Sequence, residues 1–456
     1  LAVVEQMSAW IGPGFMSGHL GPKTKNRATN AWARCLILRS LAFYNPRMFS
    51  TPYGSSAQDS PLLDHLNPEQ RGAVALPPEH ALILAGAGSG KTRVLTTRIA
   101  WLLQTSQVSP GGILAVTFTN KAAKEMMTRL SAMLPVNVRG MWIGTFHGLC
   151  NRLLRAHYKS VGLPQAFQIL DTQDQLSAIK RLCKQFGVDD ERFPPKQLQW
   201  FIAGCKEDGL RPHAVVAQDP DTRKKIEIYQ LYEEQCQREG VVDFGELMLR
   251  SYELLRDNAP VREHYQRRFR HILIDEFQDT NKLQYAWLQL IAADGAKIFA
   301  VGDDDQSIYA FRGAEVGNMR DFERDFAGPN VIRLEQNYRS SQRILAAANH
   351  VISQNPKLFE KKLWSEHGTG DAISVTAMAS EEVEAENVAM KISAARFEKQ
   401  ATWKDFAILY RGNHQARVIE QALRKERIPY TISGGQSFFD KAEIKDLLAY
   451  LRLLVN

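Results

Sequence analysis

The sequence predicts an α/β protein whose core is a parallel sheet, and three observations lead to this prediction. Short apolar runs alternate along the chain with stretches of helical periodicity. One run, 81–84, leads into the glycine-rich segment 85–92 and then into helical spacing over 93–103. Another run, 271–274, ends in two acids. A strand, a glycine-rich turn and a helix in this order form a P-loop, so the sheet is expected to be that of a P-loop NTPase.

The glycine-rich segment has the residues that a nucleoside triphosphate requires. Glycines let the backbone curl around an anion without Cβ clashes, and the following helix points its first N–H groups at it. Lys91 can reach the β- and γ-phosphates, and the Thr92 hydroxyl can ligate Mg²⁺. A chance glycine-rich turn is the alternative, and the order of strand, loop and helix disfavours it. The predicted nucleotide-binding residues of this segment are Ala85, Gly86, Ala87, Gly88, Ser89, Gly90, Lys91 and Thr92.

The acids that follow the run 271–274 complete the predicted site. Asp275 can hold Mg²⁺, directly or through water, and Glu276 can orient and deprotonate the attacking water. Two adjacent acids are common by chance on surface loops. An acidic pair directly after an apolar run, in a chain that already has a P-loop, favours ATP hydrolysis instead.

Further apolar runs predict the remaining strands, and one long region between them differs. Residues from about 150 to 260 have apolar side chains three and four apart, which predicts an all-helical insertion in the α/β core. The consecutive aspartates 303–305 are not a calcium loop, because the glycine and glutamate spacing of an EF-hand is missing. Strands are expected at 113–118, 141–145, 297–303, 331–334 and 407–410.

Length and composition are those of an ordinary soluble protein. The 456 residues are enough for two to four domains. No run of about 18 apolar residues occurs, so no membrane span is expected. The five cysteines lie far apart, which argues against a zinc or disulfide framework and suits a reducing cytoplasm. The net charge of +7 is weak evidence for a nucleic-acid partner, because residues 1–60 contain six basic and only two acidic side chains.

Residues 1–60 differ from the rest of the chain. They begin with Leu, contain scattered Gly, Pro, Ser and Asn, and have no sustained period. We interpret them as a disordered extension or as the product of a 5′-extended reading frame, for which Met48 is the natural start. Their arginine-rich, acid-poor composition also resembles an organelle transit peptide. This segment is therefore excluded from the fold prediction.

Seven motifs in order resemble those of superfamily 1 DNA helicases of the UvrD/Rep/PcrA type, over residues 62–456. The stretches 152–157 and 167–171 favour the UvrD branch over the Rep branch. The motifs occupy 66–70, 85–92, 117–123, 144–148, 275–279, 301–314 and 336–341. The resemblance implies a RecA-like ATP-binding domain 1A at 61–336 with a helical insertion 1B at about 147–268, the first half of a RecA-like domain 2A at 337–432, and the start of a 2B insertion at 433–456.

This resemblance implies an ATP-dependent 3′→5′ DNA helicase, a DNA-stimulated ATPase that translocates on single-stranded DNA in repair and replication. Its cofactors would be ATP and Mg²⁺, and its partners single-stranded DNA, tailed duplex DNA and repair proteins. Gln70 then pairs with the adenine edge, while Tyr338 stacks on adenine with Arg93 nearby. Gln306 resembles the γ-phosphate sensor. Arg339 resembles the finger that stabilises charge on the transferring phosphoryl group, with an ordinary surface ion pair as the alternative.

The same resemblance predicts a groove for single-stranded DNA that is lined by aromatic side chains. Bases stack on such rings with little sequence preference. A single aromatic side chain is more often part of a hydrophobic core than a DNA contact. The position of these residues within the motifs favours DNA contact instead. The predicted DNA-binding residues are Phe118, His147, Tyr309, Phe311 and Arg312. Position 311 is more often Trp in this family, so base stacking there is expected to be weaker.

The family's motifs V and VI, which supply a His, a Lys-Gly pair and a second Arg, are not found in this sequence. A chain that ends at residue 456 would leave the second sheet with an unpaired edge. We expect such a chain to bind ATP and DNA without separating strands. Three interpretations stay open: a helicase read from its N-terminal portion, a truncated ATP- and single-stranded-DNA-binding module, and the N-terminal part of an AddA/RecB-type helicase-nuclease.

Overall fold

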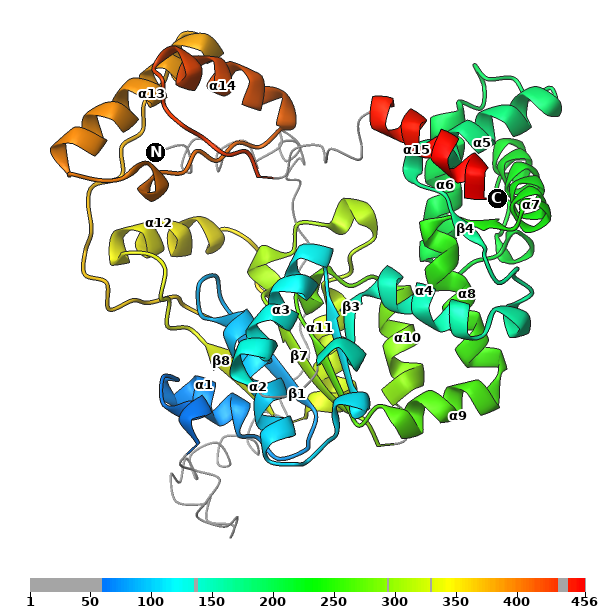
Figure 1. The fold of residues 1–456 in the computed structure, drawn as a ribbon, viewed down its shortest axis with the longest axis horizontal. Coiled ribbons are helices and arrows are strands. Elements are labelled where there is room, and N and C mark those ends of the chain that lie inside the picture. The colour runs from blue at the N-terminus through cyan, green and yellow to red at the C-terminus, as the bar shows by residue number, and fades with distance from the viewer. Residues whose placement is uncertain (1–59, 135–137, 293–294, 329, 434–441, 456) are drawn as a thin grey trace, which may run out of the picture. The chain divides into compact units, whose positions relative to one another are not determined.

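The fold of the chain is shown in Figure 1, drawn from a computed structural model. The structure describes residues 60–455 apart from 135–137, 293–294, 329 and 434–441. The interpretation of residues 1–59 as an extension therefore lies outside the described residues. The chain divides between Gly370 and Asp371 into two units, and each is described by itself.

The first unit contains a six-stranded sheet in the order β3-β2-β6-β7-β1-β8, in which every neighbouring pair is parallel. Every residue of β1, β2 and β6 is buried, as expected for strands covered on both faces. Each strand matches a predicted apolar run, which confirms the prediction of an α/β fold with a parallel sheet. The strands are β1 (Ala81–Ala85), β2 (Ile113–Thr117), β3 (Trp142–Thr145), β6 (His271–Ile274), β7 (Lys297–Gly302) and β8 (Val331–Leu334).

The two faces of this sheet contribute to separate hydrophobic clusters. The even-numbered residues of β1 belong to a cluster with side chains of α10 and α11. The odd-numbered residues belong to another cluster with side chains of α2 and α3. Successive residues of a strand point to opposite faces, so the sheet lies between two layers of helices (Figure 1). These helices are α2 (Lys91–Gln104), α3 (Asn120–Met133), α10 (Lys282–Ala292) and α11 (Gly317–Phe322).

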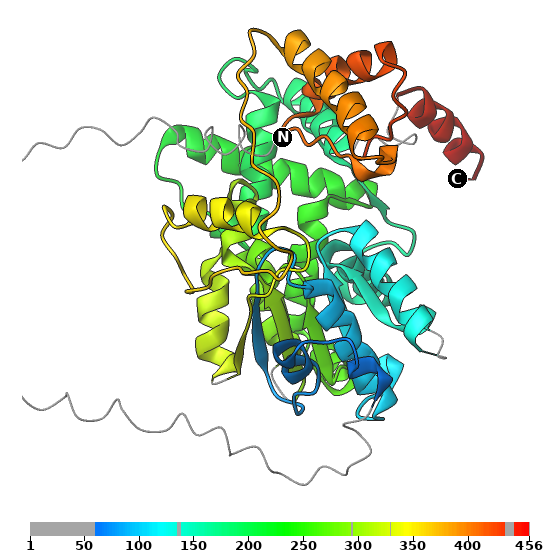
Figure 2. The same cartoon turned by 90° about the vertical axis from the view of Figure 1, so that its left-hand side faces the viewer.

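Between β3 and β6 the chain forms a mostly helical insertion (Figure 2). The all-helical prediction is wrong in one detail, because Gln168–Ile169 (β4) and Val241–Val242 (β5) pair as a small parallel sheet. Strands of two residues are too short to show an alternating pattern, and their pairing joins distant parts of the sequence. Of the helices that the structure describes, none is both long and apolar enough to cross a bilayer. The insertion contains α4 (Phe146–Ala156), α5 (Thr172–Gln185), α6 (Pro195–Glu207), α7 (Pro220–Glu239), α8 (Phe244–Asp257) and α9 (Ala259–Arg268).

A buried ionic cluster joins three helices of this insertion. The ammonium of Lys206 on α6 lies 3.0 Å from Asp243 and 2.9 Å from Glu246 at the start of α8, and the three side chains are at most 5 % exposed. Tyr232 on α7 donates a hydrogen bond to the same Asp243 carboxylate (2.9 Å). Each of these buried charges has an opposite charge beside it, as burial requires. The cluster thus fixes the three helices relative to one another.

The second unit, from Asp371 onward, contains helices but no strand in its described residues. Helices α13 (Glu381–Glu398) and α14 (Ala416–Lys425) contribute to a small hydrophobic core, and α15 (Ala442–Val455) follows in sequence. The strand predicted at 407–410 is not formed. A strand needs a hydrogen-bonded neighbour, and none is present among residues 371–433. Apolar side chains of this region are left exposed, with Leu409 at 59 %.

The division at Gly370 differs from the predicted domain boundary at 336/337. Helix α12 (Gln342–Ile352) and the segment that follows it belong to the first unit. Backbone hydrogen bonds hold this segment near the sheet, because Trp364 donates to the carbonyl of Glu335 (3.2 Å) and accepts from the N–H of Asn337 (2.7 Å). The boundary after Gly370 therefore follows from contacts between segments and not from a change in composition along the sequence. The predicted domains themselves stay a prediction.

Buried His271 makes the stability of the first unit depend on pH. This first residue of β6 is 6 % exposed, and its pKa is lowered to about 4 by burial and by the nearby charges of Arg98, Arg270 and Lys297. The unfolded chain takes up the proton near pH 6.5, so stability is lost as the pH falls from about 6.5 towards 4. We expect the melting temperature to fall less over this range in His271→Gln than in the wild type. Differential scanning fluorimetry measures this, with exposed His213→Gln as control, and identical profiles for all three proteins would contradict it.

Candidate active site

The segments that follow the strands meet at one edge of the sheet. In the register of the sheet, Leu84 lies opposite Gly302, and Val116 lies opposite both Ile274 and Gly144. Because all the strands are parallel, their carboxyl ends share this edge. The P-loop, the acidic pair and the predicted DNA-binding loops follow different strands, and the topology alone makes them neighbours.

The loop after β1 has the conformation of an anion-binding loop. Gly88 and Gly90 have φ angles of 68° and 89°, a region that glycine adopts without strain. The Ser89 hydroxyl donates to the carbonyl of Gly86 (2.7 Å), which closes the turn. At Gly86 an added Cβ would meet the end of the Leu363 side chain, which would have to move. Helix α2 begins directly after the turn, and the N–H groups of its first turn are available to an anion.

The ammonium of Lys91 is buried but makes no hydrogen bond to any described residue. Its side chain is 11 % exposed, and its ion pair is a contact of 3.6 Å with the Glu276 carboxylate. Buried ammonium groups normally have several hydrogen-bond partners. The unsatisfied Nζ therefore fits a ligand that supplies oxygens, as a triphosphate does. Thr92, the next residue of α2, is partly exposed and can present its hydroxyl to a cation at the same place.

The acidic pair after β6 carries excess negative charge. Asp275 is 7 % exposed, and its pKa is raised to about 6 by burial and by the neighbouring Glu276. Burial and Glu276 raise the pKa of Asp279 to about 6 as well. A divalent cation at this place would relieve the repulsion, so Asp275 fits the predicted role of metal ligand.

The backbone of Glu276 is strained. Its φ of 49° lies in the left-handed region, which costs a non-glycine residue about 1–2 kcal/mol. This conformation turns the carboxylate towards Lys91, at 3.6 Å, and lets it accept a hydrogen bond from Gln278 (2.8 Å). Such strain commonly occurs where chemistry fixes the position of a side chain. The geometry therefore fits a base that is held beside the triphosphate.

Gln70 supports the P-loop directly. It lies on α1 (Pro68–Val74), is 1 % exposed, and donates from its amide to the carbonyl of Ser89 (2.8 Å). Its amide oxygen accepts from the N–H of Asn67 (3.3 Å) in a capping box at the start of α1. Arg93 is exposed on the first turn of α2. Recognition of adenine by Gln70 and Arg93 stays a prediction.

The segment after β8 lies against the P-loop. The N–H of Tyr338 donates to the carbonyl of Gly88 (2.9 Å), and the Asn337 amide donates to the carbonyl of Ala87 (2.6 Å). The same Asn337 side chain accepts from the N–H of Arg339 (2.8 Å). The Arg339 side chain is exposed, and its guanidinium makes no hydrogen bond or ion pair within the described part of the chain. Asn337 thus links the P-loop to both predicted ligands of the nucleotide, a role that sequence reasoning missed because the contacts join distant segments.

A polar chain runs from the acidic pair to the loop after β7. Gln278 donates to Glu276 (2.8 Å) and accepts from the N–H of Asp303 (2.9 Å). The Gln306 amide donates to the Asp303 carboxylate. The predicted γ-phosphate sensor, Gln306, is therefore connected to the predicted base through two side chains.

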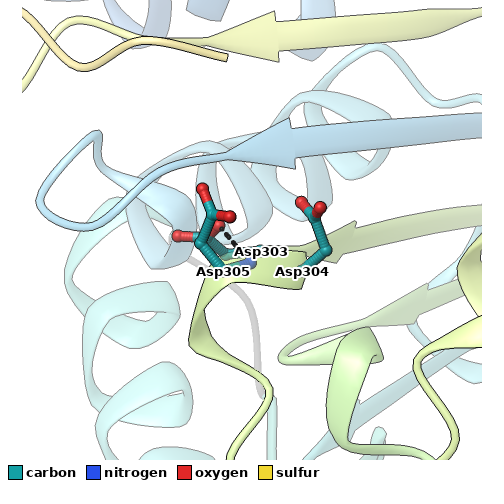
Figure 3. Close-up of side chains that lie close together, drawn as sticks. All are labelled: Asp303, Asp304 and Asp305. Atoms are coloured by element: carbon teal, nitrogen blue, oxygen red, sulfur yellow. Dashed lines mark hydrogen bonds between the residues drawn. The ribbon is translucent and has the colours of Figure 1, made fainter. Parts of the chain in front are cut away.

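Three carboxylates of this loop converge, as Figure 3 shows for Asp303, Asp304 and Asp305. They lie within 4.8 Å of one another, which is close enough for a metal ion. The ammonium of Lys361 contacts all three, so a cation of the chain itself already occupies this place.

Aromatic rings form a row at the same edge of the sheet. The rings of Phe118 and Tyr309 lie 4.8 Å apart between centroids, and those of Tyr309 and Phe311 lie 6.0 Å apart. Phe311 is 72 % exposed and Phe118 is 36 % exposed. Phe118 and Phe311 are thus exposed on either side of the partly buried Tyr309, and exposed rings suit the stacking of bases. The side chain of Arg312 lies outside what the structure describes.

His147 contacts an aromatic residue that the sequence prediction did not include. Burial lowers the pKa of His147, and its ring meets that of Phe244 edge to face at 5.8 Å. Phe244 is 45 % exposed at the first position of α8, in the helical insertion. It belongs to no recognised motif, so only its exposure beside His147 marks it as a further stacking surface.

The comparison with known proteins agrees with this geometry. The sequence profile of the UvrD/REP helicase N-terminal domain matches residues 66–327. The profile of the UvrD-like helicase C-terminal domain matches residues 332–456. The chain therefore belongs to the UvrD/REP helicase family.

Individual relatives define the branch. DNA helicase II of Escherichia coli K12 is 50 % identical over 403 residues, which cover 87 % of this chain and 55 % of that protein. DNA helicase II of Haemophilus influenzae is 51 % identical over 402 residues, with the same coverage of each chain. ATP-dependent DNA helicase Rep of E. coli is 45 % identical over 394 residues, which cover 86 % of this chain and 58 % of that protein. The predicted preference for the UvrD branch is confirmed, and the chain spans a little over half the length of these relatives.

Replacing Lys91 tests the nucleotide site. Because its ammonium makes no hydrogen bond to the residues that the structure describes, Lys91→Ala should leave the melting temperature nearly unchanged. It should weaken binding of a fluorescent ATP analogue about 10- to 100-fold, as expected for the loss of a charged hydrogen bond. The matched control is Lys124→Ala, an exposed lysine on α3. Equal nucleotide affinity in both variants would remove Lys91 from the site.

Position 311 tests the aromatic row. Phe311→Ala should weaken binding of single-stranded oligo-dT by about 1–3 kcal/mol, because a stacking face is lost. Phe311→Trp should bind at least as well as the wild type, since the larger ring keeps that face. Fluorescence anisotropy measures both, with Phe397→Ala as control because this phenylalanine is 79 % exposed in the second unit. Equal affinities of the Ala and Trp variants would show that position 311 does not contact DNA.

Proposed function

We propose that this chain binds ATP with Mg²⁺ and single-stranded DNA, and that it supplies the catalytic portion of an ATP-dependent 3′→5′ DNA helicase. The observation that carries the proposal is the buried Lys91 ammonium, unsatisfied beside a strained Glu276. A row of aromatic rings, of which Phe118 and Phe311 are exposed, lies at the same edge of the same sheet. The printed names of the relatives, DNA helicase II and ATP-dependent DNA helicase Rep, support the same activity.

In this proposal the P-loop residues hold and orient the triphosphate. Lys91 neutralises the β- and γ-phosphates, and Thr92 with Asp275 would hold Mg²⁺, which supplies a positive charge that stabilises the leaving oxygens. Glu276 accepts the proton of the attacking water. Arg339, exposed beside Gly88, stabilises negative charge on the γ-phosphoryl group. The left-handed backbone of Glu276 keeps its carboxylate on the Lys91 side of the site.

The loop after β7 is proposed to couple the nucleotide to DNA. Gln306 is three residues before Tyr309, whose ring belongs to the aromatic row. A shift of Gln306 on binding or loss of the γ-phosphate would therefore move the rings on which bases stack. Such a shift requires two alternative arrangements of this loop, each favoured by a different state of the nucleotide.

A second candidate function is binding of ATP and single-stranded DNA without strand separation. The observation in its favour is that residues 371–433 form no strand, so the second unit has no sheet of its own among these residues. Motor action requires two domains that close and reopen with the nucleotide. Unwinding of a 3′-tailed duplex, compared with DNA-stimulated ATP turnover, separates the two functions.

Glu276→Gln tests the proposed chemistry. The amide keeps the shape and the acceptor for Gln278 but cannot take a proton. Binding of an ATP analogue should stay within about threefold of the wild type, whereas DNA-stimulated turnover should fall about 10²–10⁴-fold. Glu263→Gln is the matched control, because its side chain is 53 % exposed on α9. Turnover of Glu276→Gln near the wild-type rate would exclude Glu276 as the base, and a wild-type chain that binds but does not turn over ATP would favour the second function.

A further inference from the structure

Lys361 lies in the segment that follows α12, and its side chain is only 2 % exposed. Its ammonium lies 2.8 Å from Asp303 and 2.9 Å from Asp305, and it also contacts Asp304. The side chains of Asp303 and Asp304 are nearly as buried as that of Lys361, at 2 % and 4 % exposure. One lysine therefore offsets part of the negative charge of three converging carboxylates (Figure 3) that the turn after β7 brings together.

Removing this charge would disrupt the turn. An unpaired carboxylate in a buried position costs several kcal/mol, and three carboxylates repel one another strongly at this distance. The backbone of the same segment adds a second contact, because the N–H of Phe359 donates to Asp304 (3.1 Å). The turn is therefore held from outside the sheet by a segment more than fifty residues later in the chain.

The contacts of Lys361 lead to both residues that are proposed to sense the nucleotide. Asp303, its first partner, accepts the hydrogen bond of the Gln306 amide. Three residues after Lys361, the carbonyl of Trp364 accepts from the N–H of Asn337. Asn337 in turn orients the backbone of Arg339 (2.8 Å). The segment 359–364, defined here as the strap, thus contacts the supports of Gln306 and of Arg339 at the same time.

The strap also links the two matched family regions. Asp303, Asp304 and Asp305 belong to the region matched by the N-terminal domain profile, and Lys361 belongs to that matched by the C-terminal profile. From the strap the chain continues to Gly370, the last residue of the first unit.

We propose that Lys361 is a positioning residue that fixes Gln306 through Asp303, and that this contact sets the coupling between nucleotide binding and single-stranded DNA binding. The inference rests on the proposed function, because it requires both ligands. It predicts that loss of Lys361 uncouples the two ligands while each still binds alone, since neither the P-loop nor the aromatic row includes Lys361.

The test compares three variants of the full chain. Lys361→Met removes the charge but keeps the length of the side chain, and Lys362→Met makes the same change at the exposed neighbouring lysine. The double variant Lys361→Met, Asp304→Asn restores the net charge of the cluster, so it should recover most of the melting temperature that Lys361→Met loses. Its two remaining carboxylates, Asp303 and Asp305, still lack the ion pair with the strap.

Coupling is measured as the ratio of oligo-dT affinities with and without a non-hydrolysable ATP analogue and Mg²⁺. We expect this ratio to approach one in Lys361→Met and in the charge-balanced double variant, a change of at least about fivefold. Lys362→Met should keep the wild-type ratio. Recovery of the ratio together with the melting temperature in the double variant would mean that Lys361 acts on stability alone, which overturns the proposal.

A double-mutant cycle of Lys361→Met with Gln306→Ala tests whether Lys361 affects the coupling through Gln306. If Lys361 acts through Gln306, combining Lys361→Met with Gln306→Ala should change the ratio no more than either variant alone. Additive effects would overturn this route.

Hydrogen exchange separates failure of the inference from failure of the proposed function. Amides 303–307 should exchange faster in Lys361→Met than in Lys362→Met, whether or not either ligand binds. Unchanged exchange at these amides would overturn the positioning role. A wild type that binds neither ligand, with faster exchange in Lys361→Met, would leave the positioning contact standing and refute the proposed function.

Discussion

The structure of the site depends on charges that are buried at the carboxyl edge of the sheet and are only partly compensated by the protein. Within the described part of the chain, Lys91 has an ion pair at 3.6 Å but no hydrogen bond, and Asp275 has a pKa raised to about 6 by burial and by Glu276. Water-exposed groups would not have these properties. A triphosphate would supply oxygens to the Lys91 ammonium, and a divalent cation would supply the positive charge that Asp275 and Glu276 lack.

The strain at Glu276 follows from the same constraint. A left-handed backbone directs its carboxylate to Lys91 and to the Gln278 amide, at a cost that the surrounding strands must offset. The sheet meets that cost, because β6 is buried along its whole length between β2 and β7. A well-packed sheet thus keeps a small number of polar groups in positions that they would not adopt in a flexible loop.

Polar side chains also connect the predicted nucleotide contacts to one another. Gln278 and Asp303 join Glu276 to Gln306, while Asn337 joins the P-loop to Arg339. These contacts are short, directional and at least partly buried, so a displacement at one end changes the geometry at the other. The second unit differs, because its hydrophobic core is small and apolar side chains such as Leu409 are exposed. The first unit is therefore the part of the chain in which side-chain positions are best determined by packing.

The sequence by itself determined the parallel sheet and named the residues of the candidate nucleotide site. Apolar runs and the glycine-rich turn follow from local rules, so six strands, the P-loop and Asp275 with Glu276 were all predicted. The resemblance carried by the order of the motifs predicted roles for Gln306, Tyr338, Arg339 and the aromatic residues. Local sequence patterns alone could not have predicted these roles. The strand predicted at 407–410 failed because pairing depends on a neighbour, not on apolar residues alone.

Tertiary structure alone decided the contacts between distant segments. The pairing of β4 with β5, the support of the P-loop by Asn337, the position of Phe244 beside His147 and the contact of Lys361 with three aspartates join residues far apart in sequence. No local period or motif encodes such a pair, because its energy comes from burial and hydrogen bonding that exist only after the chain has folded. The residues of the candidate site could thus be named from the sequence, whereas the connections that hold them in place could not.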